Sequence, residues 1–589
     1  MGVGSRPAGH GGRWVWRLMV GLAVGLGALA GLAAPASAHA TLESTEPANG
    51  TVLAHSPGKV VLHFDQQVSV SPTSIEVFNA SAKRVDSGDT KHVPGDSHSV
   101  ETAIPVSLPA GGYVVTWRVV SADSHPVNGA FTFSLGTAGA GGSIGSEASR
   151  LLAQSSGSRT VGVTYGVVRF LAFVAVAMLL GGLVFATVIW PEAAQHPRTR
   201  RILWSGLVAL AVATVAAFLL QGVYGAGLGL TEVLKSTVLK AVWDTRFGKV
   251  YAARLVLLAV AAALIPPLGG HRTSSAARAR FLIAWAVLGV AILATWGLAD
   301  HASTGSLVVL AVPFDVVHLG AASIWLGGLV MTLVVVLPAG RATPASDPSP
   351  IRVAMPRFSQ WALVAVVAIV ATGLFAAWRQ VGVSWGALTT TPYGKLVLYK
   401  TGGLVLLVVL ASVSRTTVHG GLTLRGTSTR SARAGSSRSG SSLRATTRLR
   451  NAVSAEIVVV IAVLALSAVL VSARPAKQAY AAPFSSEVKA GPTLVDLVVD
   501  PAKAGPLAVH LYILTSSGLV DNVPEVDATM SNAGAGISGL KIPIQPAGPG
   551  HYVAYGFDVP IAGTWTINVT VRTDSIDEYF ADLITVRIR

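Results

Sequence analysis

The sequence predicts a multi-domain membrane protein in which an N-terminal β-sandwich and a C-terminal β-sandwich flank a transmembrane bundle of eight α-helices. Two observations predict this class. Hydrophobic residues make up 51% of the 589 residues and charged residues only 12%, a balance outside the range of soluble globular proteins. Apolar stretches long enough to cross a bilayer recur through the middle of the chain, whereas both ends carry short β-rich runs bounded by Pro, Gly, Asn and Ser.

Residues 1–38 have the pattern of a signal peptide. Arginines precede an apolar core at 18–32, and an A-x-A cleavage site ends at Ala38. Cleavage after Ala38 makes His39 the N-terminus of the mature chain. The alternative is that the apolar core is retained as an uncleaved anchor helix.

Residues 39–138 are expected to form the N-terminal β-sandwich. They lack helical periodicity and contain short strand-like runs at 60–64, 74–78, 112–117 and 129–133. A linker rich in Gly, Ser and Ala follows at 139–160.

Residues 161–473 are expected to form the membrane domain. Each crossing needs about 20 apolar residues, and such stretches lie at about 161–190, 202–228, 249–268, 281–298, 307–338, 360–379, 394–414 and 452–473. Arginines concentrate in the odd-numbered connections, for example at Arg198 and Arg450. Because basic residues mark cytoplasmic loops, the prediction is a multi-pass protein of the cell membrane with both β domains outside.

The C-terminal segment, 480–589, is again β-patterned, with alternating runs at 507–513, 552–557 and 564–569. His510, Met530 and His551 are too scattered in this segment to predict a site, so a structural role is expected for them.

Charge and residue usage narrow the partners. The formal charge of +16 comes from arginines between apolar runs, which indicates membrane topology and a lipid bilayer as partner, not nucleic acid. The chain has no cysteine and six methionines, which excludes thiolate sites and disfavours a Met-rich Cu(I) site. Any bound metal must be held by nitrogen or oxygen.

His39, Asp123 and His125, together called the outer site, are the candidate metal ligands. The α-amine of a mature N-terminal histidine and its Nδ1 chelate one ion, and the amine gives up its proton easily at neutral pH. Asp123 and His125 lie two apart, so in an extended strand they share a face. Tetragonal nitrogen and oxygen coordination favours Cu(II). The alternative is an incidental N-terminus and a polar strand end before Pro126.

The same residues carry a resemblance. Residues 39–136 resemble the CopC family of periplasmic copper-resistance proteins in the start HATL, in STEPANG at 44–50, in WRVVSADSHPVNG at 117–129 and in FTF at 131–133. The resemblance implies a single Cu(II) held by the outer site. Residues 39–138 contain no methionine, so a Cu(II)-only form is expected. His55, His63, His92 and His98 are expected to be solvated surface residues.

Residues 161–473 resemble the CopD family of membrane copper proteins in DVVHLGAASIWLGG at 315–328, RFS at 357–359 and TPYGK at 391–395. The C-terminal segment resembles, more weakly, YtkA-like and FixH-like domains. Asp315 and His318, here called the membrane pair, share a helix face inside a predicted span, where ionisable groups mark function. His301 precedes that span, so copper could pass from His301 to the pair. The alternative is a structural role, with Asp315 beside a cation and His318 hydrogen-bonded.

The leading functional hypothesis is copper acquisition, in which the N-terminal domain captures Cu(II) outside and the membrane domain takes it onward. A buffering protein that confers resistance without transport uses the same outer site. Arg169, Arg254, Arg379 and Lys400 would repel a cation and suit a haem- or quinone-linked redox protein. A copper monooxygenase with a histidine brace is the enzymatic alternative, but the Asp123 carboxylate fills the open position, so no enzyme is predicted. The sequence names no copper reductase or chaperone partner.

Overall fold

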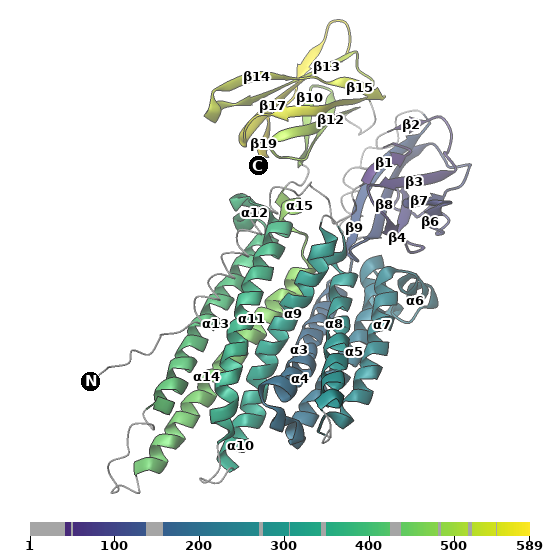
Figure 1. Cartoon of the computed structure of the whole chain (residues 1–589). Helices are drawn as coiled ribbons and strands as arrows, with labels where there is room; N and C mark the ends of the chain where they lie inside the picture. Colours follow the sequence, from purple (N-terminus) through teal and green to yellow (C-terminus); the bar gives the residue numbers. More distant parts are fainter. Residues whose placement is uncertain are drawn as a thin grey trace.

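The computed structural model describes residues 40, 42–48, 51–136, 157–269, 275–304, 307–342, 349–423, 437–480, 484–515, 521–548 and 550–589. The signal peptide at 1–38, His39 and most of the linker at 139–160 lie outside these residues. The predicted architecture is confirmed, with a β domain at each end of the chain and a helical membrane domain between them (Figure 1).

The N-terminal domain consists of two sheets. The first has the order β1 (Leu42–Glu46), β3 (Lys59–Phe64), β7 (Asp96–Ala103) and β6 (Lys91–Val93). The second has the order β2 (Val52–Leu53), β9 (Pro126–Leu135), β8 (Gly111–Ser121) and β4 (Val68–Ser69), with β5 (Ile75–Asn79) also paired to β8. Alternating apolar side chains fill the space between them, and Phe64 meets Trp117 edge to face at 5.4 Å.

Strands β8 and β9 form the hairpin that positions the outer site. Their antiparallel register runs from Gly111 opposite Leu135 to Val120 opposite Pro126, so the chain must reverse between Ser121 and His125. Gly129 lets the two strands pack closely, because a Cβ there would lie 2.5 Å from the Trp117 ring. The WRVVSADSHPVNG segment is therefore one hairpin end.

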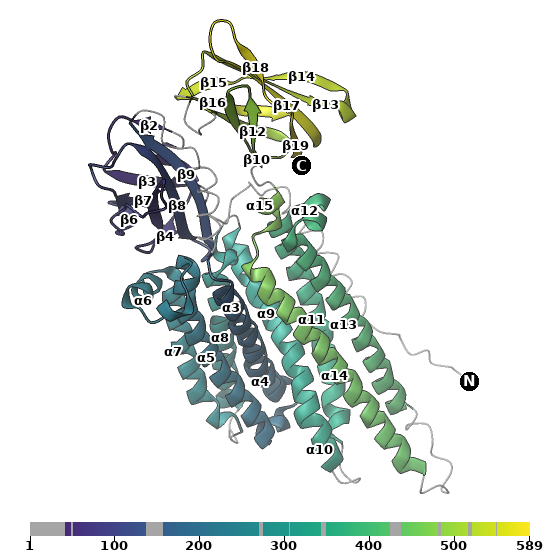
Figure 2. The same cartoon turned by 180° about the vertical axis from the view of Figure 1, so that it is seen from behind.

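The membrane domain confirms the eight predicted spans. Within the described residues, the helices long and apolar enough to cross a bilayer are Arg159–Ile189, Pro197–Ala226, Arg246–Leu264, Ser275–Ala299, Val308–Gly340, Pro350–Val381, Pro392–Ser412 and Thr447–Ser472. They contain, in order, α3 (Arg159–Val176), α5 (Pro197–Ala226), α7 (Arg246–Leu264), α8 (Ser275–Ala299), α9 (Val308–Met331), α11 (Pro350–Val381), α13 (Pro392–Thr423) and α14 (Ser437–Ser472). Both β domains lie at the same end of this bundle (Figures 1 and 2), as an even number of crossings requires.

Three short helices lie at the end of the bundle that faces the β domains: α6 (Ser236–Trp243), α12 (Trp385–Thr390) and α15 (Ala476–Tyr480). Trp243 and Trp385 on the first two are exposed. Tryptophan is enriched where the hydrocarbon of a bilayer meets its headgroups. The sequence predicts no helix in these stretches, of which two lie between spans and the third follows the last span.

Glycines let the first and fifth spans touch backbone to backbone. A Cβ at Gly181 would lie 1.9 Å from the Ser323 carbonyl oxygen, and one at Gly327 would lie 2.4 Å from that of Ala177. Inside a bilayer, close van der Waals contact between small residues is a main source of helix association. This contact fixes α9, which carries the membrane pair, against the helix that begins beneath the N-terminal domain.

Gly181→Val is expected to destabilise the membrane domain by ~1–3 kcal/mol or more, because the new side chain meets backbone that cannot yield. Gly166→Val on the same helix is the matched control, since nothing lies within 4 Å of a Cβ there. Thermal unfolding in detergent should show a lower Tm for the first variant only. Equal Tm shifts for both would contradict the close approach.

The C-terminal domain also consists of two sheets. One has the order β10 (Phe484–Ala490), β11 (Thr493–Asp500), β12 (Gly505–Thr515), β16 (His551–Val559) and β15 (Gln545–Gly548). The other has the order β14 (Ile537–Ile542), β13 (Glu525–Asn532), β17 (Gly563–Arg572) and β18 (Glu578–Phe580), with β19 (Ile584–Ile588) paired to β17. Trp565 and Met530 are fully buried in the core between them.

Candidate metal site

Asp123 and His125 lie in the tight turn between β8 and β9, not in an extended strand as expected. Ser121 N–H donates to the His125 carbonyl at 2.9 Å, and Ser124 has a left-handed backbone with φ of 71°. The turn, and not strand alternation, brings the two side chains together: the Asp123 Oδ1 lies 3.6 Å from the His125 Nδ1. Both side chains are buried.

The two nitrogens of the His125 ring face different groups. Nδ1 faces Asp123, whereas Nε2 lies 2.6 Å from the Val471 carbonyl oxygen at the end of α14. Metal-binding histidines commonly donate their second N–H to a carbonyl, which fixes the ring and leaves the other nitrogen for the metal. The Val471 carbonyl therefore fixes the orientation of the ring, with Nδ1 3.1 Å from the Asp123 carbonyl oxygen.

Ala40, the residue after His39, contacts the same turn. Its backbone N–H donates to the Ser121 Oγ at 3.0 Å, and the residue is buried. His39 lies outside the described residues, but a chain that begins there starts one peptide bond from this contact. Among the described residues no three His, Cys, Asp or Glu side chains are grouped to hold a metal, so the three-ligand site depends on His39.

The turn is seated on the C-terminal ends of three membrane helices. The last carbonyls of a helix have no partner within it and carry partial negative charge. The Arg118 guanidinium donates to the Tyr224 and Gly225 carbonyls of α5 at 2.9 and 2.8 Å, and the Ser124 Oγ donates to the Ala299 carbonyl of α8 at 2.9 Å. The Val471 carbonyl of α14 faces His125 in the same way. Three negative helix ends thus surround the turn, which favours a cation there.

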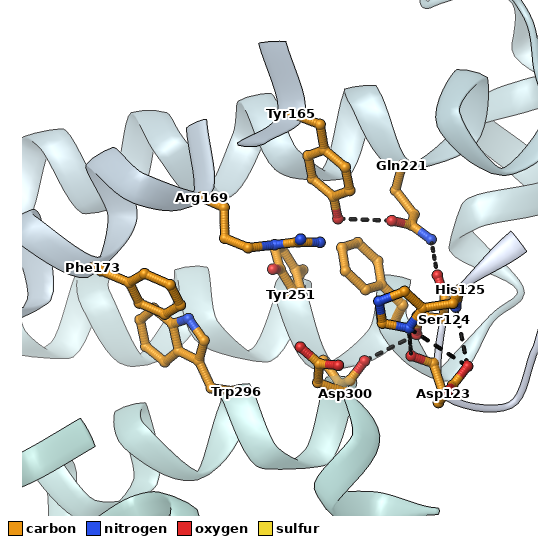
Figure 3. Close-up of a pocket in the computed structure, with 12 residues that line it drawn as sticks. Asp123, Ser124, His125, Tyr165, Arg169, Phe173, Gln221, Tyr251, Trp296 and Asp300 are labelled. Atoms are coloured by element: carbon orange, nitrogen blue, oxygen red, sulfur yellow. Dashed lines mark hydrogen bonds and ion pairs between the residues drawn. The ribbon is translucent and has the colours of Figure 1, made fainter. Parts of the chain in front are cut away.

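Side chains of the membrane domain complete the contact. Gln221 donates through Nε2 to the Ser124 carbonyl at 2.9 Å and accepts from the Tyr165 hydroxyl at 2.7 Å (Figure 3). Arg246 donates to the Ala122 carbonyl at 2.6 Å. Hydrogen bonds to α5, α7, α8 and α14 therefore hold the Asp123/His125 turn against the bundle.

Arg118→Met is expected to loosen this docking, because each hydrogen bond from a charged donor contributes ~1.5–3 kcal/mol. Hydrogen exchange in the 121–126 turn should become at least about tenfold faster, which corresponds to ~1.4 kcal/mol. Lys83→Met, at an exposed position of the same domain, should leave the exchange unchanged. Unchanged protection in Arg118→Met would show that the guanidinium does not hold the domains together.

A pocket lies directly beneath the turn. Its walls come from the turn and from α3, α5, α7 and α8, and they are formed by Asp123, Ser124, His125, Tyr165, Arg169, Phe173, Gln221, Phe247, Tyr251, Trp296, Ala299 and Asp300. Figure 3 shows Asp123, Ser124 and His125 at one end of this interdomain pocket and Phe173 and Trp296 at the other. The outer site thus opens toward the membrane domain.

Asp300 is the acidic group of the membrane domain in this pocket. Burial alone would lower the pKa of His125, but the hydrogen bond to Asp123 and the charges of Asp300 and Asp123 outweigh it, so the pKa is raised. Asp300 therefore lies beside the outer site, on the short segment that leads through His301 to α9.

Two of the arginines that would repel a cation are engaged by other groups. Arg169 stacks on Tyr165 at 4.6 Å and donates to the Ser472 Oγ at 2.6 Å. Arg254 is fully buried between the rings of Tyr251 and Trp296, at 4.2 and 3.8 Å. Cation–π contact offsets part of the cost of such charges.

The membrane pair lies on α9, which begins at Val308, so Asp315 and His318 are ~10–15 Å along the helix from its outer end. Asp315 faces α8, since its Oδ2 would be 3.2 Å from a Cβ at Gly297. His318 faces α11, and its Nδ1 lies 2.8 Å from the Thr372 Oγ1. The two side chains therefore contact different helices: Asp315 lies against α8 and His318 against α11.

The hydrogen bond at Thr372 indicates which His318 nitrogen carries the proton. The Thr372 hydroxyl donates its single hydrogen to the Ala368 carbonyl at 2.6 Å, so it accepts from Nδ1–H of His318. Nε2 then carries the lone pair, and the hydrogen bond to Thr372 fixes the orientation of the ring. The same contact also fits the structural alternative for His318.

The remaining members of the predicted path are close by. His301 lies in a short helical turn, His301–Ser303, directly after Asp300, and its side chain is outside the described set. Arg379 donates to the Thr304 carbonyl. Within the described residues no salt bridge is found at Asp315, so its pairing with a cation stays a prediction.

Sequence reasoning missed Asp300, Thr372 and Val471. Asp300 had a signal, an acid directly after a span. Thr372 had none, because a lone threonine in an apolar helix is unremarkable, and Val471 contributes only its backbone carbonyl.

Comparison with known proteins covers most of the chain. The family model of the "CopC domain" matches residues 42–136, that of "Copper resistance protein D-like, N-terminal domain" matches 160–309, and that of "Copper resistance protein D" matches 352–470. "Copper transport protein CutJ" of Bacillus subtilis (strain 168) is 26% identical over 92% of this chain and 94% of its own length.

Other relatives match the N-terminal domain. "Copper resistance protein C" of Escherichia coli is 33% identical over 18% of this chain and 90% of its own length. The crystal structure of CopC from Methylosinus trichosporium OB3b is 29% identical, covers 16% of this chain and 93% of its own, and has a TM-score of 0.15. The likeness of 480–589 to YtkA-like and FixH-like domains stays a prediction. With a CopC domain followed by both parts of a CopD domain, the chain belongs to the CopC–CopD fusion proteins of copper transport and resistance.

Proposed function

We propose that this protein acquires copper: the outer site captures Cu(II) outside the cell, and the membrane domain receives it for movement inward. The observation that carries this proposal is the seating of the Asp123/His125 turn on the membrane bundle, where Val471 of the last span orients the His125 ring. The full-length similarity to a protein named for copper transport supports it. No catalytic reaction is part of the proposal.

The charge distribution supports the orientation. The bundle end opposite the β domains carries basic residues, among them Arg198, Arg200, Arg201, Arg278, Arg280, Arg352, Arg448 and Arg450. The positive-inside rule makes that end cytoplasmic. Both β domains are then extracytoplasmic, which is also where the predicted signal peptide would send the N-terminal domain.

The route that we propose runs from the outer site past Asp300 and His301 to the membrane pair. Asp300 lines the pocket under His125 and directly precedes His301 and α9, so its carboxylate offers a hard oxygen donor on the way from the outer site to the membrane pair. Copper binds both nitrogen and carboxylate ligands. Arg169 and Arg254 contact aromatic rings but keep their positive charge, which disfavours a free hydrated ion and favours copper held by ligands.

The test is the copper content of cells that lack the protein and are complemented with wild type or Asp300→Asn. Wild type should restore cellular copper, and Asp300→Asn should restore much less although its outer site still binds one Cu(II). Asp244→Asn, at an exposed outer position, should behave as wild type. If the deletion cells instead contain as much copper as wild-type cells but tolerate less copper in the medium, the buffering function would be established.

A membrane redox function is the second candidate, and one observation favours it. Within the described part of the chain, Nη2 of the buried Arg254 has no hydrogen-bond partner, and it lies between aromatic rings that also line the pocket. A propionate or a quinone oxygen could accept from it. The visible absorption spectrum of the purified protein decides: a haem band, or a quinone in the extract, would replace copper acquisition by this function.

A further inference from the structure

Two histidines that are far apart in the sequence meet in the C-terminal domain. His510 lies on β12 and His551 on β16, and the His510 Nδ1 is 3.1 Å from the His551 Nε2. The sequence had predicted only structural roles for them. The antiparallel register explains the meeting: His510 is opposite Val553 and Tyr512 is opposite His551, so the two histidines are diagonal neighbours on one sheet face.

Aromatic rings hold both imidazoles in place. Tyr512 stacks on His551 with centroids 4.4 Å apart and planes within 10°, and Tyr555 meets His510 edge to face at 5.8 Å. The two imidazoles are themselves nearly parallel, at 12°. Such contacts restrict where the rings can go and so lower the entropy cost of binding a ligand between them.

The nitrogen–nitrogen distance matches a shared metal ion. Two nitrogens that each lie ~2.0–2.1 Å from one ion are ~2.8 Å apart in tetragonal and ~3.3 Å apart in tetrahedral geometry. The observed 3.1 Å lies between these values. Without a metal, one ring must donate a proton to the other. An ion can replace that proton after a small turn of each ring, since the χ2 torsion of histidine is soft.

We propose that His510 and His551 form a second copper site, which binds Cu(II) through His510 Nδ1 and His551 Nε2, with water in the remaining positions. Imidazole nitrogens suit copper, and Cu(II) leads the divalent first-row metals in affinity for such donors. Both histidines are half-buried and so accessible to solvent, which gives the ion an entry path.

Acidic residues lie along the same sheet face. Tyr512, opposite His551, is also opposite Asp496, which is itself opposite Glu487. The Asp496 carboxylate, two strands or ~10 Å from His551, is too far to be a direct ligand but lies within about one Debye length, whereas Glu487 is one strand farther away. This site is separate from the outer site in sequence and in domain, and it does not depend on the proposed direction of transport.

The test uses the full-length chain in detergent with the outer site weakened by His125→Gln and the membrane pair disabled by His318→Gln. Titration with Cu(II) should show one bound equivalent that depends on His510 and His551, and the electron paramagnetic resonance signal of that equivalent should show coupling to two nitrogens. Adding His510→Gln or His551→Gln should remove that equivalent, whereas adding His55→Gln, at an exposed position of the N-terminal domain, should not. Zn(II) should bind more weakly than Cu(II).

Several results would overturn the proposal: no copper on the His125→Gln chain, an unchanged spectrum after His510→Gln plus His551→Gln, or tighter binding of Zn(II). If the His510→Gln or His551→Gln variant misfolds, chemical modification of histidines in the His125→Gln chain tests the site without either variant. Cu(II) should then protect His510 and His551, but not His55, from diethyl pyrocarbonate. Modification of both despite Cu(II) would rule the site out. None of these results concerns the outer site. The proposed function is therefore tested separately.

Discussion

His125→Gln is expected to weaken Cu(II) binding at the outer site by on the order of 10²-fold or more, because an amide replaces an imidazole nitrogen and because loss of even an indirect contact to a metal-binding histidine costs 10–100-fold. An extra residue before His39 should have a similar effect, since it moves the α-amine out of chelating reach. Calorimetric titration of the full-length, processed chain in a background of His551→Gln and His318→Gln measures the outer site without the other two proposed copper sites.

His55→Gln is the matched control, because His55 is an exposed histidine of the same domain. Its affinity should equal that of the parent chain. The fold should be intact in every variant, as judged by thermal unfolding, because Asp123 and the Ser121 backbone still close the turn. Parent-like affinity in His125→Gln, or in the extended chain, would refute the proposed three-ligand chelate.

Asp315→Asn and His318→Gln are expected to reduce copper accumulation at least about tenfold while leaving Cu(II) affinity at the outer site unchanged. Both remove a donor inside the bundle, where no water can replace it. Thr372→Val should produce a smaller loss, because it removes the acceptor that orients His318 but not the ligand itself. Cellular copper over time, measured in complemented deletion cells, reports the transfer step.

Thr401→Val provides the control for Thr372→Val. Thr401 is also a membrane threonine that donates to a carbonyl four residues earlier, but it is exposed to lipid and contacts no histidine. Wild-type accumulation is expected for it. If Thr372→Val and His318→Gln both accumulate copper normally, His318 has only the structural role of a hydrogen-bonded bundle residue.

The membrane architecture could be predicted because the bilayer imposes a length on apolar sequence. All eight spans were found, but their ends were not. The fourth was expected at 281–298, whereas α8 begins at Ser275 and includes Arg278 and Arg280. Hydropathy reports the thickness of the hydrocarbon, and a helix continues beyond it as long as its backbone hydrogen bonds are made.

The proximity of Asp123 and His125 could be predicted but not the surroundings of the two residues, and their role as metal ligands stays a prediction. Asp123 and His125 have a recognisable residue pattern, yet the reason that they converge is a turn with a left-handed Ser124, which strand alternation does not predict. The groups that hold the turn are mostly backbone carbonyls at helix ends, which any residue could supply. The His510–His551 contact depends on strand register, which single-sequence patterns do not specify.

The contact between His125 and Val471 has a thermodynamic consequence. The Val471 carbonyl belongs to the last turn of α14, which leads through α15 into the C-terminal domain, so it can move only with that helix. If the position of α14 changes the affinity for Cu(II) by some factor, then bound Cu(II) must shift the equilibrium of α14 by the same factor. Occupancy of the outer site by Cu(II) and the position of α14 are therefore coupled, and a change in either can be detected by measuring the other.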